Sequence, residues 1–349
     1  MNLDICMASD DNYAVHLGIC IVSIMENNSS NINMHILDNN ISEVNLNKLK
    51  SLEDKYPNLT IIFYNTHDFF KEKEAGNIIK KELNGTIFYD RLGISAFSRL
   101  FLEDILPNDI ERVLYLDSDT IVLGSLDELF DIDFNNHLVL GVVDVMSNVG
   151  IYFYQGDDKS TPFVNSGSLL INLEKWREIG FANLSVDLIR SYPDKDFMHD
   201  QNIINIVCRD DVGFLNPKYN VMSEYFYVDY KKNLKFNDYF ASTEKFNSPE
   251  VVYESLKHPV VVHFMSQVWD RPWMSQVGLF KHTPKNPFND CYHYYKSISP
   301  WSDEKIQENE KKFFVKSYYE SIRFITMHFP VSFIAFFNYI KNKYRFNVK

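Results

Sequence analysis

Residues 112–122 read RVLYLDSDTIV and join a short apolar run to two acidic residues. The run, residues 113–116, has the unbroken hydrophobicity that is typical of a strand buried on both faces. Asp117 and Asp119 follow it, with the small Ser118 between them. Because residues two positions apart on a strand point to the same side, we expect the two carboxylates to lie together at the end of a buried strand.

Two neighbouring carboxylates beside a buried strand are costly unless a positive charge neutralises them. Their hard oxygen atoms suit Mg²⁺ or Mn²⁺, so the pair is a candidate metal site. A turn that ends the strand and then caps a helix would also place two Asp residues here. The pair alone leaves both interpretations open.

The composition is that of a globular protein, with 45% hydrophobic and 23% charged residues in 349. The net charge of −12 argues against a general nucleic-acid-binding protein. This charge is unevenly distributed, because residues 321–349 contain five Lys and Arg and no acidic residue. The first 320 residues therefore carry −17, and the last thirty form a different kind of surface.

The cysteines and the N-terminus indicate the compartment. The four cysteines are widely spaced and form no CxxC pair, which favours a reducing compartment. No basic segment with a long apolar run opens the sequence, so we expect no signal peptide. No apolar run reaches the length of a membrane-spanning helix. We therefore expect a cytoplasmic protein.

Strand-like and helix-like segments alternate through the first 145 residues. The expected strands are 4–8, 34–37, 59–64, 113–116 and 138–143, and the expected helices are 14–26, 42–56 (capped by Ser42) and 95–106. This alternation predicts an α/β fold with a mostly parallel central sheet and helices on both faces. Ligands bind such sheets at the carboxyl ends of strands, where Asp10 and Asp117 lie. Further along, we expect a strand and a helix from residue 163, a helix at 196–207 and a strand at 259–264.

Three further polar groups are candidates for ligand binding. Asp10 and Asn12 follow the first strand and suit a nucleobase or ribose, although a loop that caps a helix is equally consistent. Asn165 and Gln201 can bind sugar hydroxyls. Asp200, beside Gln201, can do so too, or its negative charge can simply interact with the positive N-terminal end of a helix dipole. His263 ends an apolar strand, where it is either a core residue or a third metal ligand.

Five segments resemble, in order and at similar spacing, those of the family 8 glycosyltransferases. They are ASDDNY, RVLYLDSDTIV, FVNSGSLLINLEKW, HDQNIIN and HFMSQVWDRPW, and together they cover roughly residues 3–275. The likeness is to bacterial α-galactosyltransferases of lipooligosaccharide synthesis and, more distantly, to glycogenin. It implies a Rossmann-like nucleotide-sugar-binding fold of the GT-A type. It also implies Mn²⁺-dependent (or Mg²⁺-dependent), retaining transfer of galactose or glucose from a UDP-sugar to an oligosaccharide or lipid-linked glycan of a surface polysaccharide.

The resemblance also implies roles for individual residues. The residues that match the family's metal ligands are Asp117, Asp119 and His263. Those that match its donor-binding residues are Ala8, Asp10, Asn12, Tyr13, Arg99, Ser118 and Arg271. Those that match the pocket for the donor sugar and acceptor are Asp144, Asn165, Asp200 and Gln201. Gln201 matches the residue on the β face of the sugar. Since an amide is a poor nucleophile, we favour a front-face reaction in which the departing phosphate deprotonates the acceptor, while Asp200 remains a candidate nucleophile.

One segment departs from the family pattern. The family has a Gly, a Lys and a Pro-Trp after the histidine, whereas this chain has Ser266 for the Gly, two added residues, and Arg271 for the Lys. An arginine can bind phosphate oxygens bidentately, so the charge is retained. The departure leaves open a non-catalytic UDP-sugar-binding protein. The stretch LDSDTIV also fits a haloacid-dehalogenase-type phosphohydrolase, although three strand–helix units precede it here.

The end of the chain is expected to differ from the rest. We expect residues 1–280 to form the catalytic domain and residues 281–349 to form a helical region rich in basic and aromatic residues. Such segments lie in the interface of anionic membranes, which would place the protein on the inner face of the membrane. A helix packed back on the domain is the alternative.

Overall fold

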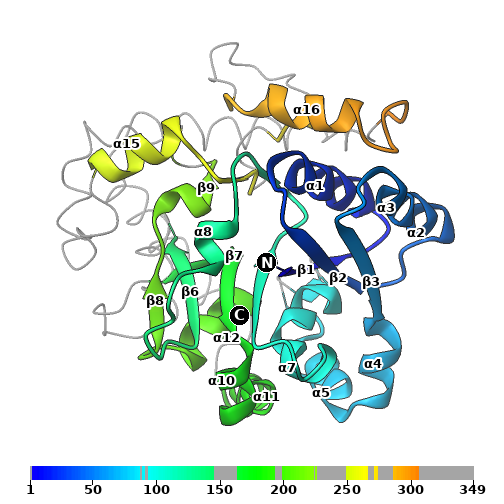
Figure 1. The fold of residues 1–349 in the computed structure, drawn as a ribbon. Helices are drawn as coiled ribbons and strands as arrows, with labels where there is room; N and C mark the ends of the chain where they lie inside the picture. Colours follow the sequence, from blue (N-terminus) through cyan, green and yellow to red (C-terminus); the bar gives the residue numbers. More distant parts are fainter. Residues whose placement is uncertain are drawn as a thin grey trace, which may run out of the picture.

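Seven strands form the central sheet of the computed structural model, which describes residues 2–86, 89–90, 93–144, 163–192, 199–223, 225, 249–265, 271–273 and 286–305. In spatial order they are β3 (Leu59–Asn65), β2 (Asn31–Asp38), β1 (Asn2–Ser9), β4 (Arg112–Leu116), β7 (Val164–Asn172), β6 (Val139–Val143) and β8 (Val212–Phe214) (Figure 1). Only β7 runs against its neighbours, because every other pairing in this sheet is parallel. The mostly parallel sheet expected from the sequence is confirmed.

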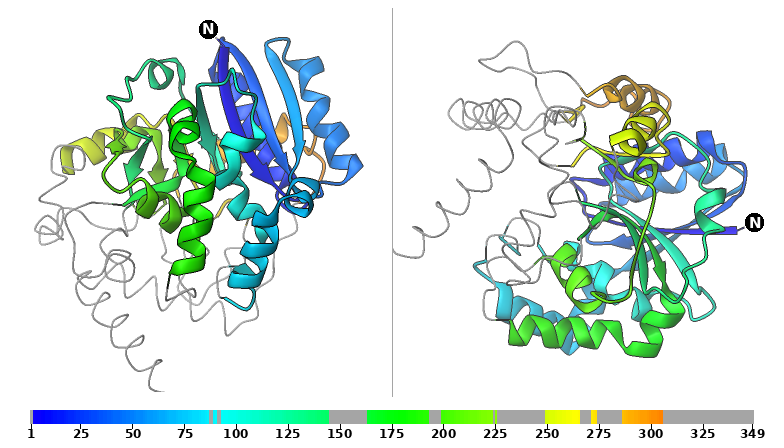
Figure 2. Two further views of the ribbon diagram at one scale, coloured as in Figure 1. Left: turned by 90° about the horizontal axis from the view of Figure 1, so that it is seen from below. Right: turned by 90° about the vertical axis from the view of Figure 1, so that its left-hand side faces the viewer.

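Helices cover both faces of this sheet (Figure 2). One face carries α1 (Ala14–Asn27), α2 (Glu43–Lys50), α3 (Leu52–Lys55) and α16 (Asn289–Ser297), and the other carries α4 (Thr66–Glu72), α5 (Glu74–Leu83), α7 (Leu102–Ile105), α10 (Leu173–Ile179), α11 (Phe181–Ser191) and α12 (Asp200–Val207). Because successive side chains of a strand point to opposite faces of the sheet, the core is divided in two. Leu114 and Leu116 join the core on the α1 face, while Val113 and Tyr115 join the core on the other face.

A second, three-stranded sheet stands beside the α1 face. It contains β5 (Thr120–Val122), β10 (Val261–His263) and β9 (Val221–Met222), in that order. The remaining described elements are η1 (Ile94–Phe101), α8 (Asp127–Phe130), η3 (Pro217–Tyr219) and α15 (Pro249–Lys257). The antiparallel pairing of β10 with β5 sets His263 opposite Thr120. This register brings two segments that are distant in the sequence to the same end of β4.

The expected helix 14–26 is confirmed as α1, whereas three other expected helices are shorter or divided in the structure. The 42–56 segment breaks at Ser51 into α2 and α3, and Ser42 caps α2 by accepting a hydrogen bond from the Asn45 N–H at 3.4 Å. The 95–106 segment begins as the 3₁₀ helix η1, in which the Ser98 hydroxyl bonds to the Ser95 carbonyl at 2.5 Å. Such side-chain bonds compete with the α-helical pattern. In the 196–207 segment, α12 begins at Asp200, and residues 196–198 lie outside the described part of the chain.

The described residues after 280 pack into the main core. Tyr292 of α16 is 1% exposed and Trp301 is fully buried, and both belong to the core on the α1 face. The Trp301 ring occupies space that only a glycine leaves, because a Cβ at Gly18 would lie 2.1 Å from it. Residues 286–305 thus share this core, whereas residues 306–349 lie outside the described residues. No described helix is both long enough and apolar enough to cross a membrane.

Replacing Trp301 by Ala should lower the free energy of unfolding by roughly 3–5 kcal/mol, as removal of a buried indole usually does. The Trp301 Nε1–H also donates to Asn45 at 3.0 Å, and that bond would be lost as well. Urea denaturation followed by circular dichroism measures the change. Tyr294→Ala is the matched control, because that side chain is 56% exposed. Equal stability of the two variants would show that the Trp301 ring does not contribute to the core.

Candidate metal centre and polar pocket

Three metal-binding side chains converge where β4 ends. Asp117 and Asp119 lie on the turn between β4 and β5, and His263 ends β10. Their ligand atoms all lie within 4.8 Å of one another. The His263 Nε2 atom is 3.1 Å from Asp119 Oδ1 and 3.8 Å from Asp117 Oδ2. A turn, held by the Thr120 N–H donating to the Asp117 carbonyl at 3.1 Å, brings the carboxylates together, and not strand alternation as expected.

This donor set fits a divalent cation. Two carboxylates supply hard oxygens and the imidazole supplies a nitrogen, a combination that Mn²⁺ and Mg²⁺ sites use. His263 is 4% exposed, Asp119 12% and Asp117 25%, and this partial burial makes two adjacent negative charges unfavourable without a positive partner. Of all the described residues, these form the one His, Cys, Asp and Glu group that is close enough to share an ion.

Arg99 of η1 neutralises the cluster from one side. It is 6% exposed, and its Nη2 atom lies 2.6 Å from Asp117 Oδ1 while its Nε atom lies 3.1 Å from Asp200 Oδ2. Its Nη1–H donates to the Ser166 carbonyl at 2.8 Å, and the guanidinium lies over the Tyr115 ring at 4.2 Å. One arginine therefore fixes the positions of β4, β7 and α12 relative to one another at this end of the sheet.

Arg271 neutralises the cluster from the other side. Its Nη2 atom lies 2.9 Å from Asp119 Oδ2, and its Nη1–H donates to the Tyr13 hydroxyl at 2.9 Å. Its Nε–H donates to the Phe264 carbonyl at 3.0 Å. The segment that differs from the family pattern therefore still places a positive charge, Arg271, beside the acidic pair. The same side chain joins that pair to the loop after β1.

The surrounding charges separate the pKa values of the acids. Burial raises the pKa of Asp117 by more than the Arg99 charge lowers it. Burial would also raise the pKa of Asp119, but His263 and then Arg271 outweigh it and hold that pKa well below its usual range. For Asp200, burial is likewise outweighed, here by Arg99 together with His199 and the Ser166 hydroxyl, and the pKa falls to about 2. Asp119 and Asp200 are therefore ionised at neutral pH.

A network of amides and one carboxylate lies next to the metal cluster. The Asp144 Oδ2 atom accepts from Asn165 Nδ2 and from Gln201 Nε2, each at 2.9 Å. The Ser166 N–H donates to Gln201 Oε1 at 3.1 Å, which fixes the orientation of the Gln201 amide. Asp200 takes part differently, since it accepts from the Ser166 hydroxyl at 3.1 Å and pairs with Arg99. The ends of strands β6 and β7 and helix α12 thus build one polar network.

The loop after β1 reaches the cluster at two points. The Ser118 hydroxyl donates to the Ala8 carbonyl at 2.9 Å, and Tyr13, 36% exposed, bonds to Arg271 as described. The Asp10 carboxylate accepts from the Tyr13 N–H at 3.0 Å and from Asn12 at 3.4 Å. Those contacts are what a loop before a helix makes. The structure thus places the loop beside the cluster and leaves the roles of Asp10 and Asn12 as predictions.

Two residues to which the sequence analysis assigns no individual role contact His263. Gly167 of β7 faces the imidazole so closely that a Cβ would lie 2.1 Å from His263 Cε1. Asn220, between η3 and β9, is fully buried and contacts both His263 and Asn165. The small NSGS run in β7 hints at a close approach, whereas nothing near Asn220 in the sequence marks it.

The fold and this site define a Rossmann-like α/β protein with a candidate cation site beside a network of polar side chains. The chain belongs to glycosyl transferase family 8, whose sequence model matches residues 4–276. It is therefore a member of a glycosyltransferase family, and the resemblance found in the sequence is confirmed. The haloacid-dehalogenase alternative has no support, since β4 lies in mid-sheet after three other strands.

Curated relatives of this chain come from several bacteria. General stress protein A of Bacillus subtilis (strain 168) is 26% identical over 306 residues, which span 86% of this chain and 95% of that protein. The lipopolysaccharide 1,2-glucosyltransferase of Escherichia coli is 24% identical over 90% of this chain and 83% of its own length. A putative glycosyltransferase of Haemophilus influenzae is 30% identical over 62% of this chain and 63% of that protein.

A solved structure shows the same fold. The galactosyltransferase LgtC, in complex with donor and acceptor sugar analogues, aligns with a TM-score of 0.64 and 23% identity, over 87% of this chain and 98% of LgtC. The GT-A-type fold expected from the sequence is thereby confirmed. The C-terminal helical tail is described only as far as α16 and the residues to 305.

Proposed function

We propose that the protein transfers a hexose from a UDP-sugar to a glycan acceptor, with retention at the anomeric carbon. The observation that carries this proposal is the convergence of Asp117, Asp119 and His263 beside the Asp144, Asn165 and Gln201 network. Such a site sets a diphosphate-neutralising centre next to groups that bind sugar hydroxyls. Family membership supports the reaction type.

The three metal-binding residues would hold Mn²⁺ or Mg²⁺, and the bound cation would neutralise the charge that builds on the departing diphosphate. The chain supplies positive charge of its own at Arg271, which lies beside Asp119 and bonds to Tyr13. We propose that Arg271 binds diphosphate oxygens in place of the family's lysine. Tyr13, Asp10, Asn12, Ala8 and Ser118 are then proposed to hold the nucleoside.

The pocket contacts favour a front-face reaction. The Gln201 amide is fixed with its nitrogen on Asp144 and its oxygen on the Ser166 N–H, so it can orient a sugar but is a poor nucleophile. Asp200 is 5% exposed and pairs with Arg99, which fits a structural role. The departing phosphate would then take the proton of the acceptor hydroxyl.

We expect Gln201→Ala and Asp200→Asn each to slow turnover by roughly 10- to 100-fold, because both disturb positioning. Both variants should still give the same anomer, and the wild type should form no glycosyl adduct. Product stereochemistry by NMR and intact-protein mass spectrometry measure these outcomes. Complete loss of turnover in Asp200→Asn alone, together with a trapped adduct on wild-type Asp200, would instead establish a double displacement.

The test of the proposed function is UDP release by the purified protein with Mn²⁺ and a panel of UDP-hexoses, with EDTA as the control. A lipopolysaccharide-type or lipid-linked oligosaccharide serves as acceptor, a choice supported by the name of the Escherichia coli relative. Metal-dependent release that favours UDP-galactose or UDP-glucose would establish the transferase and name its donor. Tight UDP binding with no release for any sugar and acceptor would indicate a non-catalytic UDP-sugar-binding protein.

We further propose that the basic, aromatic C-terminal region associates with anionic membranes and brings the enzyme to its acceptor on the cytoplasmic side. The support is the composition of residues 321–349, with five basic and no acidic residues. With residues 286–305 packed in the core, we place the start of this region after residue 305.

Deleting residues 321–349 should abolish binding to anionic vesicles and leave UDP-sugar binding unchanged. Cosedimentation with phosphatidylglycerol vesicles, with neutral phosphatidylcholine vesicles as the control, measures the first effect, and calorimetry measures the second. Vesicle binding that survives the deletion would assign membrane association to another part of the chain.

A further inference from the structure

Asn220 joins the candidate metal ligand His263 to the polar pocket. Its side chain is fully buried, with Oδ1 3.2 Å from His263 Nδ1 and Nδ2 2.9 Å from Asn165 Oδ1. Asn165 in turn donates to Asp144. A single side chain outside the motifs therefore contacts both halves of the proposed site.

The direction of every hydrogen bond in this chain of residues is determined by a backbone group. The Gly167 N–H, which can only donate, bonds to Asn165 Oδ1 at 3.0 Å. That oxygen is therefore an acceptor, so Asn220 must face it with the Nδ2 donor. The Asn220 Oδ1 atom then faces His263 Nδ1, and that nitrogen must carry a proton. The Asp144 carboxylate, a pure acceptor facing Asn165 Nδ2, fixes the same orientation from the other end.

We infer that Asn220 is a positioning residue that holds His263 as the Nδ1–H tautomer and so assigns Nε2 to the metal. This inference rests on the proposed cation site. Nε2 is the nitrogen that faces the Asp119 and Asp117 carboxylates. A hydrogen bond on the other ring nitrogen of a metal-binding histidine orients the ring and raises its basicity. The same amide also holds Asn165, so metal binding and the pocket share one support.

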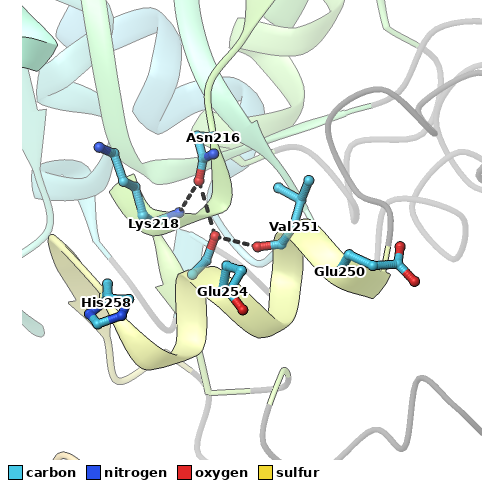
Figure 3. A pocket seen from close by; sticks show the side chains of 7 residues that line it. Asn216, Lys218, Glu250, Val251, Glu254 and His258 are labelled. Atoms are coloured by element: carbon cyan, nitrogen blue, oxygen red, sulfur yellow. Dashed lines mark hydrogen bonds between the residues drawn. The ribbon is translucent and has the colours of Figure 1, made fainter.

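Hydrogen bonds brace the η3 turn that leads to Asn220, and those of Asn216 are drawn in Figure 3. Asn216 Oδ1 accepts from the Lys218 N–H and from the Ser255 hydroxyl of α15, each at 3.0 Å. The Lys218 carbonyl accepts from the Val260 N–H at 2.7 Å, just before β10 begins. A cavity of about 330 Å³ lies between η3 and α15, and the polar groups on its wall make these bonds. These bonds join the η3 turn that precedes Asn220 to α15 and to the start of β10, the strand that carries His263.

The test is Mn²⁺ binding to the full chain, measured by isothermal titration calorimetry, for the wild type, Asn220→Ala and Asn220→Asp. Asn220→Ala should weaken Mn²⁺ binding about tenfold or more, which is typical for loss of such a partner. Asn220→Asp keeps an oxygen facing Nδ1–H but turns its second oxygen toward the Asn165 acceptor, so it should weaken Mn²⁺ binding less than Asn220→Ala does. Wild-type affinity in folded Asn220→Ala would overturn the inference, and so would equal weakening in both variants.

Asn28→Ala is the matched control, because Asn28 is another buried amide whose side chain bonds to the backbone of Leu126 and Ile24 away from the site. Its melting temperature should fall without a change in Mn²⁺ affinity. Long-range ¹H–¹⁵N spectra of metal-free protein give a second readout, with a protonated Nδ1 on His263 expected. A deprotonated Nδ1 would overturn the inference whatever the calorimetry gives. Failure of the wild type to bind Mn²⁺ would instead refute the proposed cation site.

Discussion

We expect replacement of Asp119 by Asn to lower kcat/KM for the proposed metal-dependent UDP release by roughly 10³-fold or more, since the change would remove several kcal/mol of charge neutralisation at the diphosphate. The size of the effect follows from the contacts of this one carboxylate. Asp119 lies 3.1 Å from His263 Nε2 and 2.9 Å from Arg271 Nη2, so the change leaves both groups without their anionic partner. The neighbouring Asp117 cannot take its place, because it is already paired with Arg99 at 2.6 Å.

The Asn side chain has nearly the same shape as Asp, so a loss of activity reports the lost charge and not a cavity. Calorimetry with Mn²⁺ should show weakened binding in the same variant, in parallel with the kinetics. The control is Asp109→Asn, an exposed acid outside the cluster, which should stay within about twofold of wild type. Undiminished metal-dependent release by Asp119→Asn would remove Asp119 from the proposed site.

The fold could be predicted from the sequence because its central strands β4 and β6 are buried on both faces. Residues 113–116 and 138–143 are almost continuously apolar, and the structure has β4 and β6 there. The break at Ser51 was not predictable, because neither Pro nor Gly marks it. The 3₁₀ form of η1 was also missed, since the local sequence around Ser98 has the periodicity of an ordinary helix.

The sequence could predict which residues form the candidate site better than it could predict their arrangement. The motif order singled out Asp117, Asp119 and His263, which the structure brings together, and their roles remain proposals. The contact depends on β10 pairing with β5, a partnership between residues 140 positions apart that no local pattern encodes. Asn220 was missed for the same reason, because a buried amide after a turn has meaning only once its neighbours are known.

Gly167 supports the site by leaving room for a ring. A Cβ built there would lie 2.1 Å from His263 Cε1 and 2.5 Å from Nδ1, closer than real atoms come. The backbone of Gly167 cannot easily yield, because its carbonyl accepts the Asp117 N–H at 2.9 Å and its own N–H bonds to Asn165. An alanine at position 167 would therefore either displace the imidazole from its position near Asn220 or shift β7 and move Asp117.

We therefore expect Gly167→Ala to weaken Mn²⁺ binding at least tenfold and to reduce kcat/KM by roughly 100-fold or more, since a displacement of about 1 Å has such an effect. The free energy of unfolding should fall by about 1–3 kcal/mol, as overpacking of a core usually causes. Gly124→Ala is the matched control, because a Cβ there would meet Val260 at an ordinary 3.4 Å. A folded Gly167→Ala variant with wild-type metal affinity would mean that His263 can move and still bind the metal, and the imidazole would then not be a fixed ligand. Loss of metal affinity in Gly167→Ala but not in Gly124→Ala would instead show that the geometry of the cation site depends on the absence of a side chain at position 167 of β7.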